Sequence, residues 1–219
     1  QPVAGADVLV DIRTTDVEPR LLARLNLKTD AAGRAALEYE LPSSLVGRPQ
    51  SSGDAEVQLI AQVTDSGDQQ EAARLVRTVT ARPLRIEAVP ETDSLVAGVV
   101  NQVFVFVRTA DGRPAPATLT ISGRNETIQT DPRGLAVLPV TPPQGAKTVS
   151  LNVAARDADG QTASQRVSFT CGQQSENFLV RTDRAVYRGG ESVSLTALGG
   201  GREPVFVDLL QDGQTVVTA

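Results

Sequence analysis

Apolar and polar residues alternate along most of the chain, which is the pattern of half-buried β-strands. Near the start, Val8, Val10 and Ile12 alternate with charged residues. The segments 21–27 and 57–63 alternate in the same way. Because the period is two residues rather than 3.6, the chain is predicted to consist of strands and not of helices.

The middle of the chain resolves into seven predicted strands. They cover 84–89, 99–108, 117–122, 126–130, 135–140, 148–156 and 164–170. Short alternating strands in this number are typical of a β-sandwich with two stacked sheets. The segment 103–107 is apolar on both faces. It is either a central strand with one face in the core, or a strand whose Phe104 and Phe106 face a neighbouring domain.

Two segments repeat along the chain. Residues 29–37 (TDAAGRAAL) match residues 130–138 (TDPRGLAVL), 101 positions later. Each segment reads as a tight turn that feeds an apolar strand, and Gly134 is expected to need a positive φ. A second match relates Gly98 to Gly190, 92 positions later. The chain is therefore predicted to be an array of similar modules, a design that more often binds, spans or scaffolds than catalyses.

These repeats predict an all-β fold with tandem immunoglobulin-like β-sandwich domains. The predicted domains are 1–83, which lacks its beginning, 84–171, which is complete, and 178–219, the start of a further domain. Because the first copy begins two strands late, the backbone of 8–12 is expected to lie unpaired at a sheet edge. The third copy stops after three or four strands, with opening strands expected over 179–187 and 192–198.

Composition restricts the classes of function. The chain has 219 residues, of which 40% are hydrophobic and 21% charged, with 18 Gly and 13 Pro, as in a globular protein rich in turns. A net charge of −5 with interspersed signs and an aromatic content of 3% argue against nucleic-acid binding. The most apolar stretch, 94–107, is too short to cross a bilayer, so direct membrane insertion is not expected.

Candidate chemistry is sparse. The chain has no His, so it offers no Ser–His–Asp or Cys–His arrangement and no imidazole for zinc. A single Cys excludes a disulfide within the chain and any multi-cysteine metal site. We therefore expect no enzymatic activity, no cofactor, and no catalytic, cofactor-binding or metal site. The segment 157–160 (DADG) resembles the start of a calcium loop but lacks the later ligands, so a hairpin turn is the preferred interpretation.

Two further features concern the origin of the chain. It contains no Met, which suggests an internal fragment of a longer protein. Nineteen Arg against two Lys hint at a GC-rich genome. The segment 125–127 (NET) would accept a glycan only in a secreted eukaryotic protein, and the arginine bias argues against that source.

Several segments resemble the macroglobulin domains of the alpha-2-macroglobulin and complement family, in the bacterial form. In the middle copy the resemblance is carried by 84–98, Asn101, 111–115 and 130–136. In the third copy, 179–191 (LVRTDRAVYRGGE) is similar to the family's domain-opening strand, Thr-Asp-(Lys/Arg)-x-x-Tyr-x-(Pro/Ala)-Gly. The sequence departs from that motif by having Gly where Pro or Ala is usual, which alters the turn.

The resemblance implies scaffold domains of a large protease-trapping inhibitor, an endopeptidase inhibitor of host-defence type. In such proteins a protease cleaves a bait segment in another part of the chain. These domains then form the frame that transmits the resulting collapse of the inhibitor. The implied partners are the neighbouring domains and, through the full-length protein, proteases. The implied location is extracytoplasmic, whether periplasmic, cell-surface or secreted. The other hypothesis is a bacterial surface adhesin or stalk of immunoglobulin-like repeats, because any sandwich hairpin benefits from the same turn residues.

The family's thioester motif, Cys-Gly-Glu-Gln, has a near match in 171–174 (CGQQ). In the family the motif lies in a helical domain, where aromatic residues shield it. Here it follows an alternating strand and opens a polar linker, in which a thioester would hydrolyse. We therefore interpret Cys171 as a small residue at a strand end. Its free thiol is expected to react with thiol reagents in the native and in the denatured protein.

Overall fold

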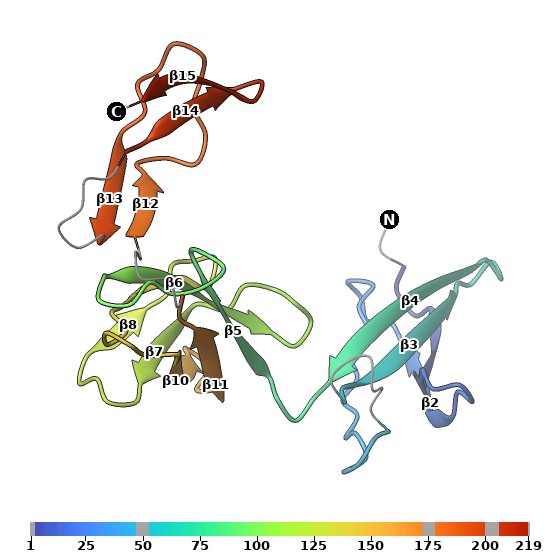
Figure 1. Cartoon of the computed structure of the whole chain (residues 1–219). Helices are drawn as coiled ribbons and strands as arrows, with labels where there is room; N and C mark the ends of the chain where they lie inside the picture. The colour runs from blue at the N-terminus through green and yellow to red at the C-terminus, as the bar shows by residue number, and fades with distance from the viewer. Residues whose placement is uncertain (1–2, 47–52, 173–177, 200–205, 219) are drawn as a thin grey trace. The chain divides into compact units, whose positions relative to one another are not determined.

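The computed structural model describes residues 3–46, 53–172, 178–199 and 206–218 (Figure 1). All the regular secondary structure in this part of the chain is β, and every strand pair is antiparallel. The all-β fold class predicted from the alternation is thus confirmed. The chain divides into two units, 1–83 with 110–112, and 84–109 with 113–219. They are described separately below.

Residues 84–171 form a sandwich of two sheets, the middle module. One sheet has the order β5-β6-β9, with β5 (Leu84–Pro90), β6 (Asn101–Thr109) and β9 (Leu135–Val140). The other has the order β11-β10-β7-β8, with β7 (Ala117–Ile121), β8 (Thr127–Gln129), β10 (Thr148–Asp157) and β11 (Thr162–Thr170). All seven predicted strands are confirmed. The alternation that marks them in the sequence places every second side chain in the core between the two sheets.

The core of the middle module lies between its two sheets. Fully buried side chains come from both sheets: Val103, Val105, Val107, Leu119, Leu138 and Val153. Phe104 and Phe106 lie on the opposite face of β6 and are half-buried. The first interpretation of this segment, a central strand with one face in the core, therefore holds for β6, which pairs with β5 on one side and β9 on the other.

The N-terminal module has one four-stranded sheet in the order β2-β1-β3-β4. Its strands are β1 (Asp7–Thr14), β2 (Leu21–Lys28), β3 (Ala55–Thr64) and β4 (Gln70–Val79). This order equals that of β8-β7-β10-β11 in the middle module. The Asp that closes the β3–β4 hairpin, Asp65, lies 92 residues before Asp157 in the β10–β11 hairpin. The N-terminal sheet is therefore the counterpart of one sheet of the sandwich.

The expectation that 8–12 lies unpaired at a sheet edge is wrong. β1 is a central strand: Val10 pairs with Leu25 of β2 on one side and with Ala61 of β3 on the other. The error came from assigning the missing strands to the sheet that contains β1. In the middle module, β5 and β6 belong to the other sheet of the sandwich, so the pairing of β1 does not depend on their counterparts.

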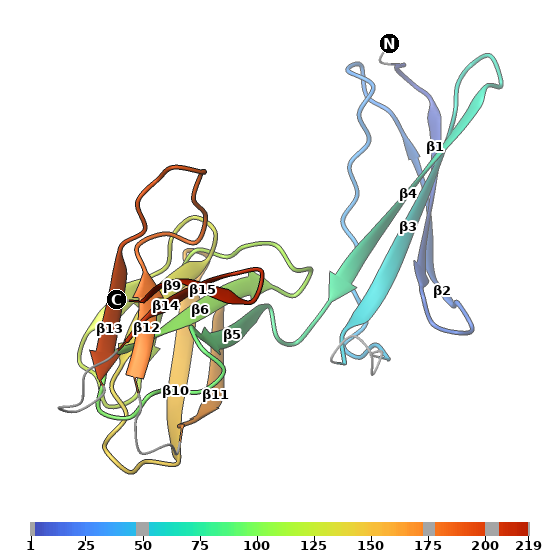
Figure 2. The same cartoon turned by 45° about the horizontal axis from the view of Figure 1, so that its top comes forward.

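The face of the N-terminal sheet that holds Val8, Val10 and Ile12 is covered by an extended segment, 35–46, which runs alongside the sheet (Figure 2). Leu37, Tyr39 and Leu45 of this segment pack against the core as half-buried side chains. In the repeat, 34–39 corresponds to β9, yet the segment forms no strand, since no counterpart of β6 lies beside it in the described structure.

Beyond residue 177, two hairpins follow, each a two-stranded sheet. The first consists of β12 (Phe178–Thr182) and β13 (Leu195–Gly199), and the second of β14 (Asp208–Gln211) and β15 (Gln214–Thr218). The predicted strand over 179–187 is too long. It ends at Thr182 because the carboxylate of Asp183 accepts hydrogen bonds from the Tyr187 hydroxyl and the Ser194 amide, which turns the chain.

Four turns have the same Asp geometry, and two of them close the β3–β4 and β10–β11 hairpins. The four Asp residues that open these turns are Asp30, Asp65, Asp131 and Asp157. In each, a carboxylate oxygen accepts a hydrogen bond from the backbone amide four residues on, at 2.8–2.9 Å. The residue three positions after each Asp has a positive φ, so the prediction for Gly134, whose φ is 71°, is confirmed. The hairpin interpretation of 157–160 is confirmed by the same geometry.

Candidate functional site

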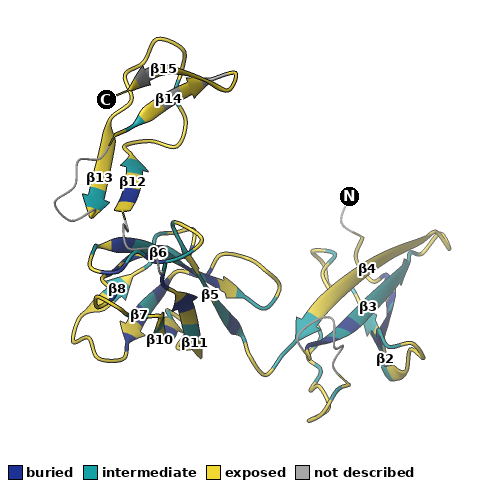
Figure 3. Cartoon of the chain, viewed as in Figure 1, coloured by how far each residue is buried: buried dark blue, intermediate teal, exposed yellow. Residues whose placement is uncertain are grey.

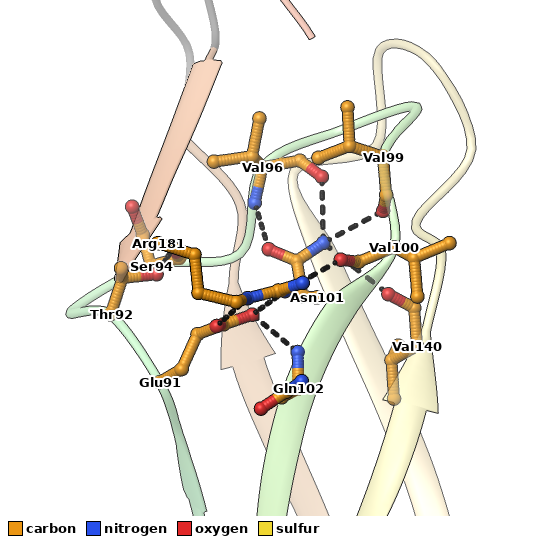
Figure 4. Close-up of polar contacts among 10 residues, drawn as sticks. All are labelled: Glu91, Thr92, Ser94, Val96, Val99, Val100, Asn101, Gln102, Val140 and Arg181. Atoms are coloured by element: carbon orange, nitrogen blue, oxygen red, sulfur yellow. Dashed lines mark hydrogen bonds and ion pairs between the residues drawn. The ribbon is translucent and has the colours of Figure 1, made fainter. Parts of the chain in front are cut away.

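The candidate site is the junction between the middle module and β12, where an Arg of β12 binds an acidic residue at the end of β5 (Figure 4). The Nε atom of Arg181 donates to Glu91 at 2.8 Å, and a terminal guanidinium nitrogen donates to the second carboxylate oxygen at 2.7 Å. The same terminal nitrogen donates to the carbonyl oxygen of Val100 at 3.0 Å. Such a bidentate pair fixes both the distance and the orientation of the two elements.

Glu91 is held in place by the connection between β5 and β6. It directly follows Pro90, the last residue of β5, and its carboxylate accepts a hydrogen bond from the backbone amide of Gln102. Its own amide donates to the carbonyl oxygen of Gln102 at 2.9 Å. Contacts within the middle module therefore hold the Glu91 carboxylate in place independently of Arg181.

Asn101 stabilises the loop on which the site is built. Its side chain is fully buried, and its amide oxygen accepts from the Val96 amide at 2.7 Å. Its side-chain nitrogen donates to the carbonyl oxygens of Val96 and Val99, both at 2.9 Å, and to that of Val140 at 3.3 Å. A buried amide with all these partners fixes the loop 96–101 against β9. The Val100 carbonyl that Arg181 contacts lies in this loop (Figure 4).

The ion pair is largely shielded from water. The side chains of Glu91 and Arg181 are 11% and 28% exposed. Burial raises the pKa of Glu91, but the hydrogen bonds from Arg181 and from the Gln102 amide outweigh burial, so the net pKa lies below the usual range. The hydrogen bond to Glu91 raises the pKa of Arg181 in turn. Both groups are therefore charged at neutral pH.

Apolar packing accompanies the ion pair on one face of β12. Leu179, two residues before Arg181, is 3% exposed, whereas Phe178 and Val180 are 46% and 42% exposed. Side chains alternate across a strand, so Leu179 and Arg181 share one face, and Phe178 and Val180 share the other. The first face is the one that docks on the middle module through Glu91. This arrangement can position a following module, and it supplies no nucleophile or proton donor.

Cys171 lies in the core of the middle module, 4% exposed, directly after β11. Its amide donates to the carbonyl oxygen of Lys147 at 2.9 Å, and it forms a bridge to Leu95. This placement agrees with a small residue at a strand end, while Gln173 and Gln174 lie outside the described residues. Burial raises the pKa of the thiol. Because a shielded thiol with a raised pKa reacts slowly, the expected reaction of Cys171 with thiol reagents should be slower in the native protein than in the unfolded chain.

Other candidate segments lie apart from this junction. Asp157 uses its carboxylate to close the β10–β11 hairpin, as described above. Asn125 and Glu126 are exposed in the loop between β7 and β8. Among the described residues, no group of three or more acidic, Cys or His side chains could hold a metal ion. Nor does the described chain contain a helix of the length and hydropathy needed to cross a membrane.

Sequence reasoning missed the pairing of Glu91 with Arg181. Both residues lie inside segments that resemble the macroglobulin pattern, but nothing in either segment indicates that they meet. The repeat does relate Glu91 to Asp183, which are 92 positions apart like Gly98 and Gly190. That spacing marks an acidic residue after the first strand in two consecutive modules, but it does not point to Arg181.

No protein-family model matches the chain, and no curated protein sequence matches it. Among solved structures, native alpha-2-macroglobulin of E. coli aligns over 90% of this chain with 12% identity and a TM-score of 0.29. The trypsin-activated form aligns over 89% with 14% identity and a TM-score of 0.31. A tetra-tandem repeat from the extending region of a large adhesion protein aligns over 90% with 14% identity and a TM-score of 0.28.

The chain spans 16%, 17% and 56% of the lengths of these three structures. Identities of 12–14% and TM-scores near 0.3 do not assign the chain to a family. The all-β fold stated above rests on the chain's own sheets and core.

Proposed function

We propose that this chain forms scaffold modules of a large extracytoplasmic protein of the alpha-2-macroglobulin type, which traps proteases. The chain itself would then be neither an enzyme nor an inhibitor. Its task would be to hold neighbouring domains in fixed orientation, so that a change in one part of the full-length protein moves the others. The partners would be the adjoining domains and, through the whole protein, proteases.

The observation that carries this proposal is the Glu91–Arg181 junction. A flexible linker between modules would need no bidentate, shielded ion pair, whereas a frame that transmits movement needs stiff joints. The segments that build the joint, 84–98 and 179–191, are two of those that resemble the macroglobulin pattern. The extracytoplasmic location is part of this proposal and rests on the same resemblance to macroglobulin domains.

The second candidate is a stalk of immunoglobulin-like repeats in a surface adhesin. One observation favours it: the 92-residue spacing is shared by Asp65 and Asp157 in one pair of modules and by Glu91 and Asp183 in the next. A recurring spacing suits a protein that gains its length from repeats, although the corresponding turns at Asp30 and Asp131 lie 101 residues apart. Stiff joints serve a stalk as well, so the two candidates differ in what the whole protein does with proteases.

The test compares the full-length protein that contains this chain with the chain alone. Each is incubated with an equimolar serine protease, and the cleavage of a large protein substrate is followed. We expect the full-length protein to reduce that cleavage and to sediment faster after the reaction, and the chain alone to do neither. Stoichiometric protection by the chain alone would refute a purely structural role. A full-length protein that leaves the protease fully active would favour the stalk.

A further inference from the structure

The N-terminal sheet carries a buried acidic side chain on its outer face. Side chains alternate along β1, so Asp11 lies on the face opposite Val10 and Ile12, which belong to the core. Asp11 is nevertheless only 7% exposed. Burial strips a carboxylate of its hydration, and this costs free energy unless charged partners offset it. The partners of Asp11 therefore determine what this face of the sheet can do.

Two arginines bind Asp11. The Nε atom and one terminal nitrogen of Arg24 donate to its two carboxylate oxygens at 2.7 and 2.9 Å. A terminal nitrogen of Arg13 donates to one of these oxygens at 2.6 Å. The hydrogen bonds from Arg24 and Arg13 hold the pKa of Asp11 far below its usual range, so the carboxylate stays ionised. Asp11 thus fixes the positions of two guanidinium groups on the outer face of the sheet.

A third arginine lies on the same face. Arg74 of β4 stands in the same row of the sheet as Asp11, because Ile60 of β3 pairs with both. The guanidinium of Arg74 donates to the side-chain oxygen of Gln58, in the amide orientation that hydrogen bonding favours. Gln58 in turn pairs with Arg13. Because β4 is exposed over most of its length (Figure 3), Arg74 is open to solvent.

Together, Asp11, Arg13, Arg24 and Arg74 form the Asp11 cluster, in which three side chains are positive and one is negative. The Nε atom of Arg13 is buried and has no hydrogen-bond partner among the described residues. A buried donor without an acceptor costs free energy, and it is rare in native proteins. A negatively charged acceptor would offset both the unmatched donor and the excess of positive charge.

The shared sheet order does not require this cluster. In the middle module, Asn152 of β10 stands where the N-terminal sheet has Ile60, 92 residues earlier. Beside it, in the place of Asp11, lies Ser122, whose amide donates to the Asn152 carbonyl oxygen at 3.0 Å. On its other side Asn152 pairs with Arg166. That row has an arginine but no acidic residue to hold it, so the Asp11 cluster is a property of the N-terminal sequence and not of the fold.

We propose that the Asp11 cluster binds a dianionic phosphate group, either as the free ion or as a monoester. Guanidinium groups match the oxygens of phosphate with pairs of parallel hydrogen bonds, which an ammonium group cannot form. A dianion balances the positive charge that Asp11 leaves over in the cluster. Asp11 itself does not contact the phosphate and acts by holding Arg13 and Arg24 in place. This site is independent of the scaffold function proposed above.

The first experiment titrates the isotope-labelled chain with glycerol 3-phosphate at constant ionic strength, and carbon-detected NMR follows the Nε signals of the arginines. At about pH 7.5 this ester is a dianion, since its second pKa is about 6. We expect saturable shifts at Arg13, Arg24 and Arg74 with one common Kd. Arg77, exposed on the opposite face of β4, should not shift. Shifts that do not saturate, or that are equal at Arg77, would overturn the proposal.

Two further ligands test the charge and the source of the phosphate group. Dimethyl phosphate has the same tetrahedral shape but one negative charge, and it should bind about tenfold more weakly or worse. Equal binding of dimethyl phosphate would contradict a site for a dianion. Inorganic phosphate distinguishes the sources: a site that accepts it and the ester alike recognises the group on a larger molecule. Binding of inorganic phosphate alone would restrict the site to the free ion.

The second experiment repeats the titration with variants at Arg74, which is exposed and donates to Gln58, so that its replacement should leave the sheet folded. Arg74→Gln should weaken binding at least about fivefold, as expected for the loss of a charge-assisted hydrogen bond. Arg74→Lys should recover only part of this loss, because lysine keeps the charge but lacks the planar fork. Arg77→Gln is the matched control and should bind as the unmodified chain does. Full recovery with Arg74→Lys, or an equal loss with Arg77→Gln, would reveal only general attraction by charge and overturn the proposal.

Discussion

Glu91 and Asp183 occupy the same position in consecutive modules. The carboxylate of each accepts a hydrogen bond from the backbone amide eleven residues on, which belongs to Gln102 for Glu91 and to Ser194 for Asp183. The amides of the two acidic residues donate back to the carbonyl oxygens of the same partners, at 2.9 and 3.1 Å. An acidic side chain thus closes the first strand connection in both modules. Glu91 has a second task, because it also binds Arg181 of the next module.

Replacement of Arg181 by Gln is expected to loosen β12 without unfolding the middle module. The variant removes two charge-assisted hydrogen bonds to a carboxylate that is 11% exposed, which costs about 1–3 kcal/mol. The amides of 179–182 should then exchange with solvent roughly tenfold faster or more, since about 1.4 kcal/mol corresponds to a factor of ten. Hydrogen exchange followed by mass spectrometry measures this. Peptides from β6 and β10 in the same spectra serve as the internal reference.

A double-mutant cycle separates the pair from its surroundings. Glu91→Gln, Arg181→Gln and the double variant are compared by the exchange of β12. If the two side chains act on each other, the double variant should lose little more than Arg181→Gln alone. Strictly additive losses of protection in β12 would mean that Glu91 stabilises the structure only through its hydrogen bond with the Gln102 amide. Arg188→Gln, an exposed arginine of the same module, controls for the loss of positive charge.

The junction is expected to weaken in acid. The pKa of Glu91 in the folded protein lies below its ordinary value of 4.5, so the separated state binds a proton more readily than the docked state. The contribution of the pair is therefore fully present above about pH 5 and is lost as the pH falls below 4.5 toward the folded pKa. Exchange of β12, corrected for the intrinsic pH dependence of amides, should show this loss. The Glu91→Gln variant should lack this loss in acid. That result would distinguish the titration of Glu91 from those of Asp131 and Asp183, whose pKa values are also lowered.

Gly134 and Gly112 allow a test of close packing at equal backbone strain. Both have positive φ, 71° and 85°, so Ala strains the backbone similarly at either position. A Cβ at Gly134 would lie 2.2 Å from the carbonyl oxygen of Val107, whereas one at Gly112 meets nothing within 4 Å. Gly134→Ala should therefore destabilise the protein by about 1–3 kcal/mol more than Gly112→Ala. Thermal unfolding of the two variants measures the difference, and equal midpoints would contradict it.

The strands of this protein could be predicted from its sequence because each carries its own alternation. The seven strands of the middle module were found on that basis, and so were β1 to β3 in outline. The turns were found for a similar reason, since Asp131 and Gly134 lie within one short segment. In both cases the information is local.

The pairing of strands and of modules could not be found in the same way. Alternation shows that 8–12 has one buried face but not which strands lie beside it, so β1 was wrongly placed at an edge. Glu91 and Arg181 are 90 residues apart, and an isolated acidic residue and an isolated arginine carry no mark of each other. Such contacts depend on how whole sheets are stacked, which no single segment encodes.

Cys171 should be a free but slow thiol. We expect the intact mass to equal the sequence mass, and alkylation of the native protein to be at least about a hundredfold slower than that of the unfolded chain, because the side chain is 4% exposed and burial raises the pKa of the thiol. Iodoacetamide labelling with and without denaturant measures both rates. A mass lower by one ammonia, which rises by the mass of one methylamine when the protein is treated with methylamine, would instead indicate a thioester with Gln174.

Asp68 occupies a position that favours glycine. It has a φ of 60° and stands three residues after Asp65, where the corresponding turns of Asp30, Asp131 and Asp157 all have Gly. A positive φ costs a non-glycine residue about 1 kcal/mol. Glycine avoids this strain but loses more conformational entropy when the chain folds. Asp68→Gly should therefore stabilise the N-terminal module by about 0.5 kcal/mol.

The reverse change, Gly160→Asp, tests the same step in the β10–β11 hairpin. A Cβ at Gly160, where φ is 81°, meets only the end of the Arg156 side chain at 3.5 Å, so packing should not obscure the backbone effect. We expect a loss of similar size, about 0.5–1 kcal/mol, in the middle module. Urea unfolding of both variants provides the measurement. Two changes of the same sign would show that the side chain at this position, and not its φ, determines the stability of the turn.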